Sequence, residues 1–264
     1  MALRFQNRLG MVAYVTCGDP DLATTKDVVL AAIHAGADVI ELGVPFSDPV
    51  ADGPVIQRAS ERALVQGTRL ADVLDLARDV RKQSDAGLII FSYLNPILRF
   101  GLEKFADTAK AAGIDGALIT DLTVEEADGY LRVMRARNLA TVFLAAPTST
   151  DARLKRIAAA SSGFIYAVSR TGITGQQKQL SVDARDLVQR LRKFTKLPIA
   201  VGFGISTAEQ FAAVGSFADA GVVGSAIVQA IEQSGRAGAA SAVAKLISSL
   251  KGKQSIATSR QVAH

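Results

Sequence analysis

The sequence is poor in cysteine and histidine, has no tryptophan, and contains no long apolar run. Cys17 is its single cysteine, so an internal disulfide is impossible and a reducing compartment is expected. No apolar stretch approaches the ~18 residues of a membrane-spanning helix. The first ten residues, MALRFQNRLG, lack the apolar stretch of a secretion signal. We therefore expect a soluble, cytoplasmic protein without membrane association.

The net charge of +5 does not indicate a nucleic-acid-binding protein. The basic excess lies after Glu232, where Lys and Arg occur without any Asp or Glu, so that residues 1–232 carry balanced charges. This balanced part has no basic stripe with interleaved aromatic residues. We expect one domain over residues 1–250 and a flexible basic tail over residues 251–264.

Short apolar runs recur along the chain with helical segments between them. The runs are nearly continuous rather than alternating, which is typical of strands buried on both faces of a parallel sheet. They cover residues 11–17, 37–43, 87–93, 116–120, 140–146, 163–169, 197–203 and 219–224. Residues 70–83 illustrate the helical periodicity, with an apolar stripe of Leu70, Val73, Leu74, Ala77 and Val80.

Strands that alternate with helices, without a linker, predict a single TIM (β/α)8 barrel. Two of the helices are expected to start at capping residues, one at Thr150–Asp151 and one at Ser206 with Glu209. An open doubly wound sheet is the rival fold. Its first turn should carry a Gly-x-Gly-x-x-Gly motif, but the first turn here reads CGDPDL. The barrel is therefore the predicted fold.

The strand ends lack the side chains of several barrel chemistries. Active sites of TIM barrels lie at the carboxyl ends of the strands. No lysine ends a predicted strand, which disfavours a Schiff-base aldolase. Of the two histidines, His34 falls on the first helix and His264 is the last residue, so a His-ligated metal is not expected. Carboxylate acid–base chemistry remains, and we predict no metal site.

Carboxylates are concentrated in the stretch ELGVPFSDPVADGP, residues 41–54. Glu41 still belongs to the second apolar run, where desolvation would raise its pKa toward a useful acid–base range. The alternative is a strand-end carboxylate held by an Arg or by backbone N–H groups. Asp48 and Asp52 follow in a proline-stiffened loop. Turn chemistry accounts well for Asp48 but less well for Asp52, which precedes a helix on the predicted active face.

Two glycine-rich turns, VGFGIS and VVGSAIV, end the seventh and eighth runs. In TIM barrels the loops after these strands, with a helix N-terminus, form a phosphate site. Gly204, Gly224 and Ser225 are the candidate donors of backbone N–H groups. Glycine also makes tight strand–helix turns, which is the alternative. After the sixth run, residues 169–181 are polar and weakly periodic, which predicts a lid loop or, alternatively, an ordinary surface loop.

Together these motifs resemble the alpha subunit of tryptophan synthase. The resemblance runs along most of the chain, and the stretches ELGVPFSDPVADGP and SRTGITG are its most specific parts. It implies a TIM barrel that cleaves indole-3-glycerol phosphate into indole and glyceraldehyde 3-phosphate. It also implies a partner beta subunit that uses pyridoxal phosphate (PLP) to join the indole to serine, in an alpha2-beta2 assembly that docks on the active face. No cofactor is expected in this chain.

The resemblance assigns roles to individual residues. Glu41 and Asp52 match the catalytic acids: Glu41 would protonate indole C3 and take the glycerol hydroxyl proton, while Asp52 would stabilise the charge at the indole N–H. Thr174 matches a lid threonine that meets Asp52. The remaining substrate-pocket positions are Tyr14, Phe91, Tyr93 and Tyr166, and the phosphate-binding positions are Gly175, Phe203, Gly204, Gly224 and Ser225.

Departures from the family pattern leave both acids intact. Thr123 stands where the family motif often has a proline, and the N-terminus leaves little room for a helix plugging the bottom of the barrel. Two other functions compete with this assignment. One is an isomerase of another phosphate-binding barrel, with Cys17 as base. The other is a non-enzymatic subunit that binds a phosphorylated ligand and regulates a partner, for which Glu41 and Asp52 would not be needed.

Overall fold

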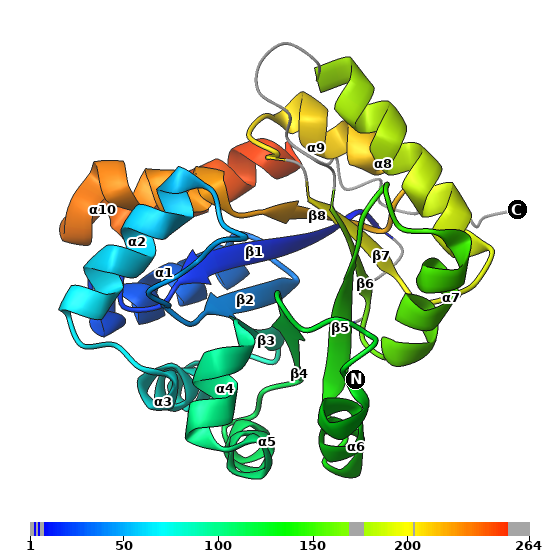
Figure 1. Ribbon diagram of the computed structural model, residues 1–264. Coiled ribbons are helices and arrows are strands. Elements are labelled where there is room, and N and C mark those ends of the chain that lie inside the picture. Colours follow the sequence, from blue (N-terminus) through cyan, green and yellow to red (C-terminus); the bar gives the residue numbers. More distant parts are fainter. Residues whose placement is uncertain (1–2, 4, 6–7, 169–176, 203, 253–264) are drawn as a thin grey trace, which may run out of the picture.

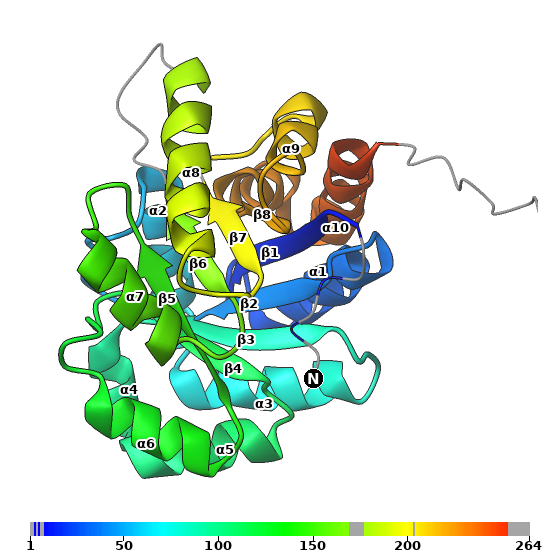
Figure 2. The same ribbon diagram turned by 90° about the vertical axis from the view of Figure 1, so that its right-hand side faces the viewer.

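The computed structural model describes residues 3, 5, 8–168, 177–202 and 204–252. Its strands form a closed parallel barrel in chain order, surrounded by helices, so the predicted TIM barrel is confirmed (Figures 1 and 2). The strands are β1 (Gly10–Thr16), β2 (Val39–Gly43), β3 (Gly87–Ser92), β4 (Gly116–Ile119), β5 (Ala140–Ala145), β6 (Ile165–Val168), β7 (Ile199–Gly202) and β8 (Ala220–Val223).

Helices cover the outside of the barrel. They are α1 (Leu22–His34), α2 (Pro54–Val65), α3 (Leu70–Arg81), α4 (Leu94–Phe100), α5 (Leu102–Ala111), α6 (Asp128–Ala136), α7 (Asp151–Ala160), α8 (Gln177–Arg192), α9 (Ala208–Val214) and α10 (Ser225–Lys251). In α10 the backbone is non-helical at Gly235, where the helix kinks. No helix in the described part of the chain is long and apolar enough to cross a membrane.

Alternate residues of each strand fill the barrel, and the strand register sets their heights. Glu41 lies beside Tyr14 on one side and Ile89 on the other, and Gly43 lies beside Phe91. Below this level the interior is apolar, formed by side chains such as Val12, Val39, Leu118, Val142 and Val222. Glu41 is therefore a carboxyl group within the apolar barrel, above its packed lower layers.

The bottom of the barrel is closed by residues near the N-terminus. Leu3 is 3% exposed and packs into the interior cluster with Phe164. The ring of Phe5 lies 6.1 Å from that of Phe164, and a side chain at Gly10 would collide with it. The side chains of Leu3 and Phe5 thus close the bottom of the barrel. The sequence indicates that the N-terminus is too short to place a helix there.

A larger apolar core lies between the barrel and the helices. In α3 the predicted stripe is buried, and Leu76 joins it. Asp75, Arg78 and Lys82 are exposed on the opposite face. These helices hold the strand ends in place, because each apolar stripe packs against the outer face of the sheet.

Helix starts agree with the sequence in one case and differ in two. Thr150 caps α7, accepting from Arg153 N–H at 3.3 Å. The start predicted at Ser206 with Glu209 is wrong by one residue, because Thr207 and Gln210 form the capping box of α9. Residues 177–181, expected in a loop, belong to α8.

Lys251 belongs to the barrel. It is the last residue of α10, and its ammonium donates to the Gly36 carbonyl and lies 3.7 Å from Asp38. Helix α10 therefore extends into the segment predicted as a tail. Residues 253–264, the rest of that segment, lie outside the described residues.

Candidate active site

Glu41 is a carboxyl group buried inside the barrel. It is 1% exposed, and its Oε1 atom accepts no hydrogen bond from the described residues. Burial raises the pKa of Glu41 to about 8, because the apolar interior penalises the charged form. An unsatisfied buried carboxyl is unfavourable for folding, and such groups in native proteins call for a functional explanation. At neutral pH this group is a proton donor held inside the barrel.

Asp52 lies in the loop between β2 and α2, within hydrogen-bond distance of the Tyr93 hydroxyl. Tyr93 Oη donates to Asp52 Oδ2 at 3.0 Å and accepts from Ala51 N–H at 2.9 Å. The Phe46 and Tyr93 rings lie 4.9 Å apart. Desolvation raises the pKa of Asp52 to about 6, and the hydrogen bond from Tyr93 opposes this rise. Asp52 is thus mainly ionised at neutral pH, while Glu41 is mainly protonated.

Asp48 plays a local role in the same loop. It is exposed, its carboxylate accepts from Ser47 Oγ at 2.6 Å, and its carbonyl accepts from Val50 N–H at 2.8 Å. This is the turn chemistry expected for Asp48. Of the three carboxylates in residues 41–54, the structure therefore withdraws Glu41 and Asp52 from solvent, at least in part, and leaves Asp48 exposed.

Aromatic side chains surround the two acids. Tyr14 and Phe91 meet edge to face, with ring centroids 5.0 Å apart. Burial, and repulsion from both Glu41 and Asp52, raise the pKa of the Tyr14 and Tyr166 hydroxyls well above the ordinary value. Both tyrosines are therefore neutral and lie within electrostatic range of the two carboxyls. Two features escaped sequence reasoning here: Thr16 Oγ1 donates to Tyr14 Oη at 3.3 Å, and glycines make room for the tyrosines.

These glycines are Gly43 and Gly202. A side chain at Gly43 would collide with the Tyr14 hydroxyl, and one at Gly202 would collide with the Tyr166 hydroxyl. The position of Gly43 could have been predicted from the sequence. Residues two apart in a strand share a face, so Gly43 lies on the same face of β2 as Glu41. The upper barrel is thus lined by aromatic rings, two acids and bare backbone, which suits a flat aromatic ligand with a polar substituent.

Cys17, considered as a base, is unsuited to that role. It is fully buried, and burial raises the pKa of its thiol far above neutrality. His34 lies on α1, at its last residue. Among the described residues no group of three His, Cys, Asp or Glu side chains could hold a metal ion.

The predicted phosphate positions in the described chain follow the neighbouring strands β7 and β8. Gly204 has a φ of +79°, a conformation that favours glycine, in the turn between β7 and α9. Gly224 is the N-cap of α10, without a side-chain cap, and Ser225 begins that helix. The first N–H groups of a helix have no intrahelical partner and attract anions. Thr174, Gly175 and Phe203 lie outside the described residues.

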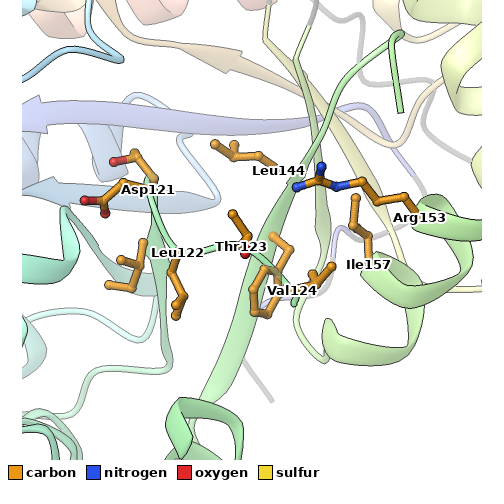
Figure 3. A pocket seen from close by; sticks show the side chains of 10 residues that line it. Asp121, Leu122, Thr123, Val124, Leu144, Arg153 and Ile157 are labelled. Carbon is orange, nitrogen blue, oxygen red and sulfur yellow. The ribbon is translucent and has the colours of Figure 1, made fainter. Parts of the chain in front are cut away.

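A hollow lies on the same end of the barrel, beside the β4–α6 loop. It has a volume of about 120 Å³, and Figure 3 shows Thr123 and Val124 of this loop on one side, with Ile157 and Arg153 of α7 on the other. Asp121 also accepts from Leu94 N–H at 2.7 Å, which ties the loop to α4. In the sequence, Thr123 is notable only as a departure from a family motif. Nothing in the local pattern predicts a hollow there, because helix α7 forms its far wall.

Known proteins resemble this chain along nearly its whole length. A family model described as "Tryptophan synthase alpha chain" matches residues 1–257. The tryptophan synthase alpha chain of Solibacter usitatus is 54% identical over 237 residues, 90% of this chain and 89% of that protein. The tryptophan synthase alpha subunit of Legionella pneumophila has 38% identity and a TM-score of 0.84, covering 92% of this chain and 91% of that one.

A chain in the crystal structure of the tryptophan synthase complex from Pyrococcus furiosus gives the same result. It is 38% identical, with a TM-score of 0.84, covering 91% of this chain and 97% of that one. The residues matched by the family model include all the strands and helices described above. The chain belongs to the tryptophan synthase alpha chain family.

Proposed function

We propose that this chain, the alpha half of a tryptophan synthase, cleaves indole-3-glycerol phosphate into indole and glyceraldehyde 3-phosphate with Glu41 and Asp52 as its catalytic acids. Family membership supports the reaction. The observation that supports the two residues is electrostatic. Two carboxyls in one aromatic-lined site have pKa values of about 8 and about 6, which keeps one protonated and the other ionised near pH 7.

Glu41 supplies and recovers a single proton. Protonated Glu41 donates to C3 of the indole ring, which converts the ring into a leaving group. The Glu41 carboxylate then takes the proton of the glycerol C1 hydroxyl, that carbon becomes the aldehyde of glyceraldehyde 3-phosphate, and the bond to C3 breaks. The electron pair of that bond returns to the indole ring. Glu41 ends the cycle protonated, so no other acid or base is required.

Asp52 stabilises the charged intermediate. Protonation at C3 leaves positive charge spread over the ring nitrogen, and an ionised carboxylate beside the indole N–H offsets it. The Tyr93 hydroxyl holds Asp52, because it bonds both the carboxylate and the neighbouring Ala51 N–H. The buried aromatic surfaces of Tyr14, Phe91 and Tyr166 provide contacts for the ring.

The substrate phosphate binds at the turns after β7 and β8 in this proposal. Backbone N–H groups at the start of α10 and around Gly204 serve as donors. A crystal soaked with an indole phosphate analogue tests this placement. Density for the phosphate elsewhere, for instance on Arg170, would contradict it.

We further propose that this chain needs no cofactor and works in the cytoplasm. PLP is assigned to the partner beta subunit, which takes the indole and joins it to serine. A partner on the active face, in an alpha2-beta2 assembly, would receive indole without its release into solution. Exposed apolar side chains at this end of the barrel, Val50 (86% exposed) and Leu98 (56% exposed), favour docking there.

The competing functions fit the site less well. An isomerase with Cys17 as base is disfavoured, because a buried thiol with a raised pKa cannot accept a proton from substrate. A subunit that only binds a phosphorylated ligand gains nothing from a buried Glu41 whose Oε1 atom has no hydrogen-bond partner among the described residues, because such a group is unfavourable for folding.

The direct test is an assay of indole release from indole-3-glycerol phosphate by the purified chain, with and without a beta subunit. The proposal predicts slow release by the chain alone and faster release in the complex. Glu41→Gln should fold normally and lose at least ~10²-fold in kcat, the usual scale of acid–base catalysis. Release of no indole by the wild-type chain under both conditions would contradict the function.

A further inference from the structure

An ion-pair network ties helix α2 to the β1–α1 loop and to helix α10, and the proposed reaction does not use it. Arg62 is its centre: Nε and Nη2 donate to the two carboxylate oxygens of Asp19, each at 2.8 Å. Nη1 of Arg62 donates to Glu232 Oε1, also at 2.8 Å. Arg58, one turn earlier on α2, donates to Glu232 at 3.2 and 3.1 Å.

The Arg62–Asp19 pair differs from an ordinary surface ion pair. Asp19 is 2% exposed, so its carboxylate depends on Arg62 for the interactions that water would otherwise supply. The pairing is bidentate and uses the planar fork of the guanidinium. Lysine could not reproduce it, because one ammonium group cannot hold two carboxylates in this geometry.

The fully buried residues of α2 are all small: Ala59, Ser60 and Ala63. The N-cap of α2 is Gly53, which makes no side-chain capping bond. A small apolar cluster of Ala59, Tyr14 of β1 and Val228 of α10, with Val55 and Ile56 of α2 packed against it, marks the same junction. The bidentate pair of Arg62 with the buried Asp19 adds a directional contact to this limited packing.

Each of the three joined segments adjoins or contains part of the proposed active site. The β1–α1 loop follows the strand that carries Tyr14, helix α2 begins two residues after Asp52, and α10 begins at Ser225, seven residues before Glu232. Helices α2 and α10 lie side by side on the barrel (Figure 1). In the proposed placement, a substrate with an indole ring at one end and a phosphate at the other would span this junction.

We infer that Arg62 is a positioning residue for the cleavage reaction, which holds Asp52 at a set distance from the phosphate end of α10. The inference rests on the proposed function. Its physical basis is that a displacement of about 1 Å in a reacting group can lower the rate by roughly 10²-fold. Arg62 acts through Asp52 and α10, and makes no contact with substrate in this account.

The experiment compares two variants of the full chain with a matched control. Arg62→Lys keeps the positive charge but loses the bidentate pairing with Asp19. Glu232→Ala removes the ion pairs between α2 and α10. Arg137→Lys is the control, since Arg137 also bridges two carboxylates, Glu103 and Asp107, between α5 and the end of α6. Steady-state indole release and thermal unfolding are measured for each variant.

Arg62→Lys should lose at least ~10-fold in kcat/KM, and Glu232→Ala should show a raised KM with a smaller change in kcat. Arg137→Lys should retain wild-type kinetics. Values of kcat/KM for Arg62→Lys and Glu232→Ala within twofold of the wild type would overturn the inference, as would an equal loss in Arg137→Lys. Glu232→Ala decides the question if Arg62→Lys does not fold. An inactive wild-type chain would instead contradict the proposed function.

Discussion

Glu41 is a carboxyl group in an apolar interior, a position that catalysis explains better than folding stability does. No lysine or arginine of the described chain pairs with Glu41, and its pKa of about 8 lies far above the ordinary glutamate value. Between pH 4.5, the ordinary pKa of glutamate, and about pH 8, Glu41 keeps its proton in the folded protein and loses it in the unfolded chain. Stability therefore falls as the pH rises from about 4.5 to about 8 and levels off above that range.

Glu41→Gln should remove this pH dependence. Wild-type protein should lose about 2–4 kcal/mol more of its free energy of unfolding between pH 5 and pH 8.5 than the variant does. Urea denaturation at both pH values measures the difference. Glu61→Gln, a change on the same barrel in the middle of α2, is the control and should behave as the wild type. Equal pH dependence in wild type and Glu41→Gln would show that Glu41 is not buried in this way.

Tyr93→Phe should disturb Asp52 without removing it. The variant loses the hydrogen bond that lowers the pKa of Asp52, so the acidic limb of kcat/KM should move to higher pH, by less than one unit. Loss of the Ala51 contact should also lower kcat several-fold. Tyr130→Phe is the control, because Tyr130 Oη bonds the Ala117 carbonyl outside the site at 3.2 Å. An unmoved acidic limb would argue against Tyr93 as the partner of Asp52.

Glu41 and Asp52 could be predicted as candidate catalytic residues from the sequence alone, because they lie at the end of a predicted strand and in the loop that follows it. The rule that barrel sites lie at strand carboxyl ends places both acids on one face. Two features could not be predicted: the Tyr93–Asp52 hydrogen bond, and the lack of a hydrogen-bond partner for Glu41 Oε1 among the described residues. Each depends on side chains that are distant in sequence and meet only through the register of several strands, as Tyr14, Glu41 and Ile89 do.

Helix α10 is the element that joins the phosphate site to the rest of the barrel. Its N-cap, Gly224, has a φ of −118°, which any residue can adopt. An added Cβ there would lie 3.5 Å from Tyr14 Cβ, an ordinary contact. Gly204 differs, since its positive φ makes any substitution strained. Gly224 is therefore the cleaner position at which to test anion binding.

Gly224→Val should weaken substrate binding. Its methyl groups would reach toward Tyr14, Ile56 and the space above the helix start, so KM should rise at least ~10-fold while free indole is still accepted. Gly224→Ala should have a smaller effect, because its Cβ fits. Competition by inorganic phosphate provides a second readout. Unchanged KM and phosphate competition in Gly224→Val would place the phosphate elsewhere.

Elements were predicted well where periodicity was strong and less well at their ends. The strands agree with the apolar runs within a few residues, since a buried parallel strand has few alternatives. The start of α8 at Gln177 was not predicted, because residues 169–181 are weakly periodic and indicate a loop. The buried residues Ala184, Leu187, Val188 and Leu191 carry a helical stripe that could have extended the helix prediction backward. The shift at α9 arose because two adjacent residues, Ser206 and Thr207, can both cap.

The two ends of the barrel have different roles. The bottom is sealed by Leu3, Phe5 and Phe164, while the opposite end carries the acids, the glycine-rich turns and the hollow beside α7. Val50 and Leu98 are exposed at that same end. A partner that covers this face would shield the acids from water and strengthen their electrostatic effect on the substrate.

Leu98→Asp should weaken the complex with a beta subunit by at least ~10-fold, because it places a charge on the expected docking face. The activity of the isolated chain should not change. Titration of the beta subunit, followed by light scattering and by glyceraldehyde 3-phosphate production, measures both quantities. Val65→Asp is the control, an exposed position at the far end of α2. A complex equally weakened by Val65→Asp, or unaffected by Leu98→Asp, would contradict docking at this face.

The central claim is that Glu41 works as an acid and Asp52 as an anion, and the pH profile of indole release tests it most directly. For the wild-type chain, kcat/KM should be bell-shaped, with limbs near pH 6 and pH 8 and a maximum near pH 7. Glu41→Gln should be at least ~10²-fold slower at the maximum and lack the alkaline limb. An active Glu41→Gln enzyme that keeps the wild-type profile would contradict the account.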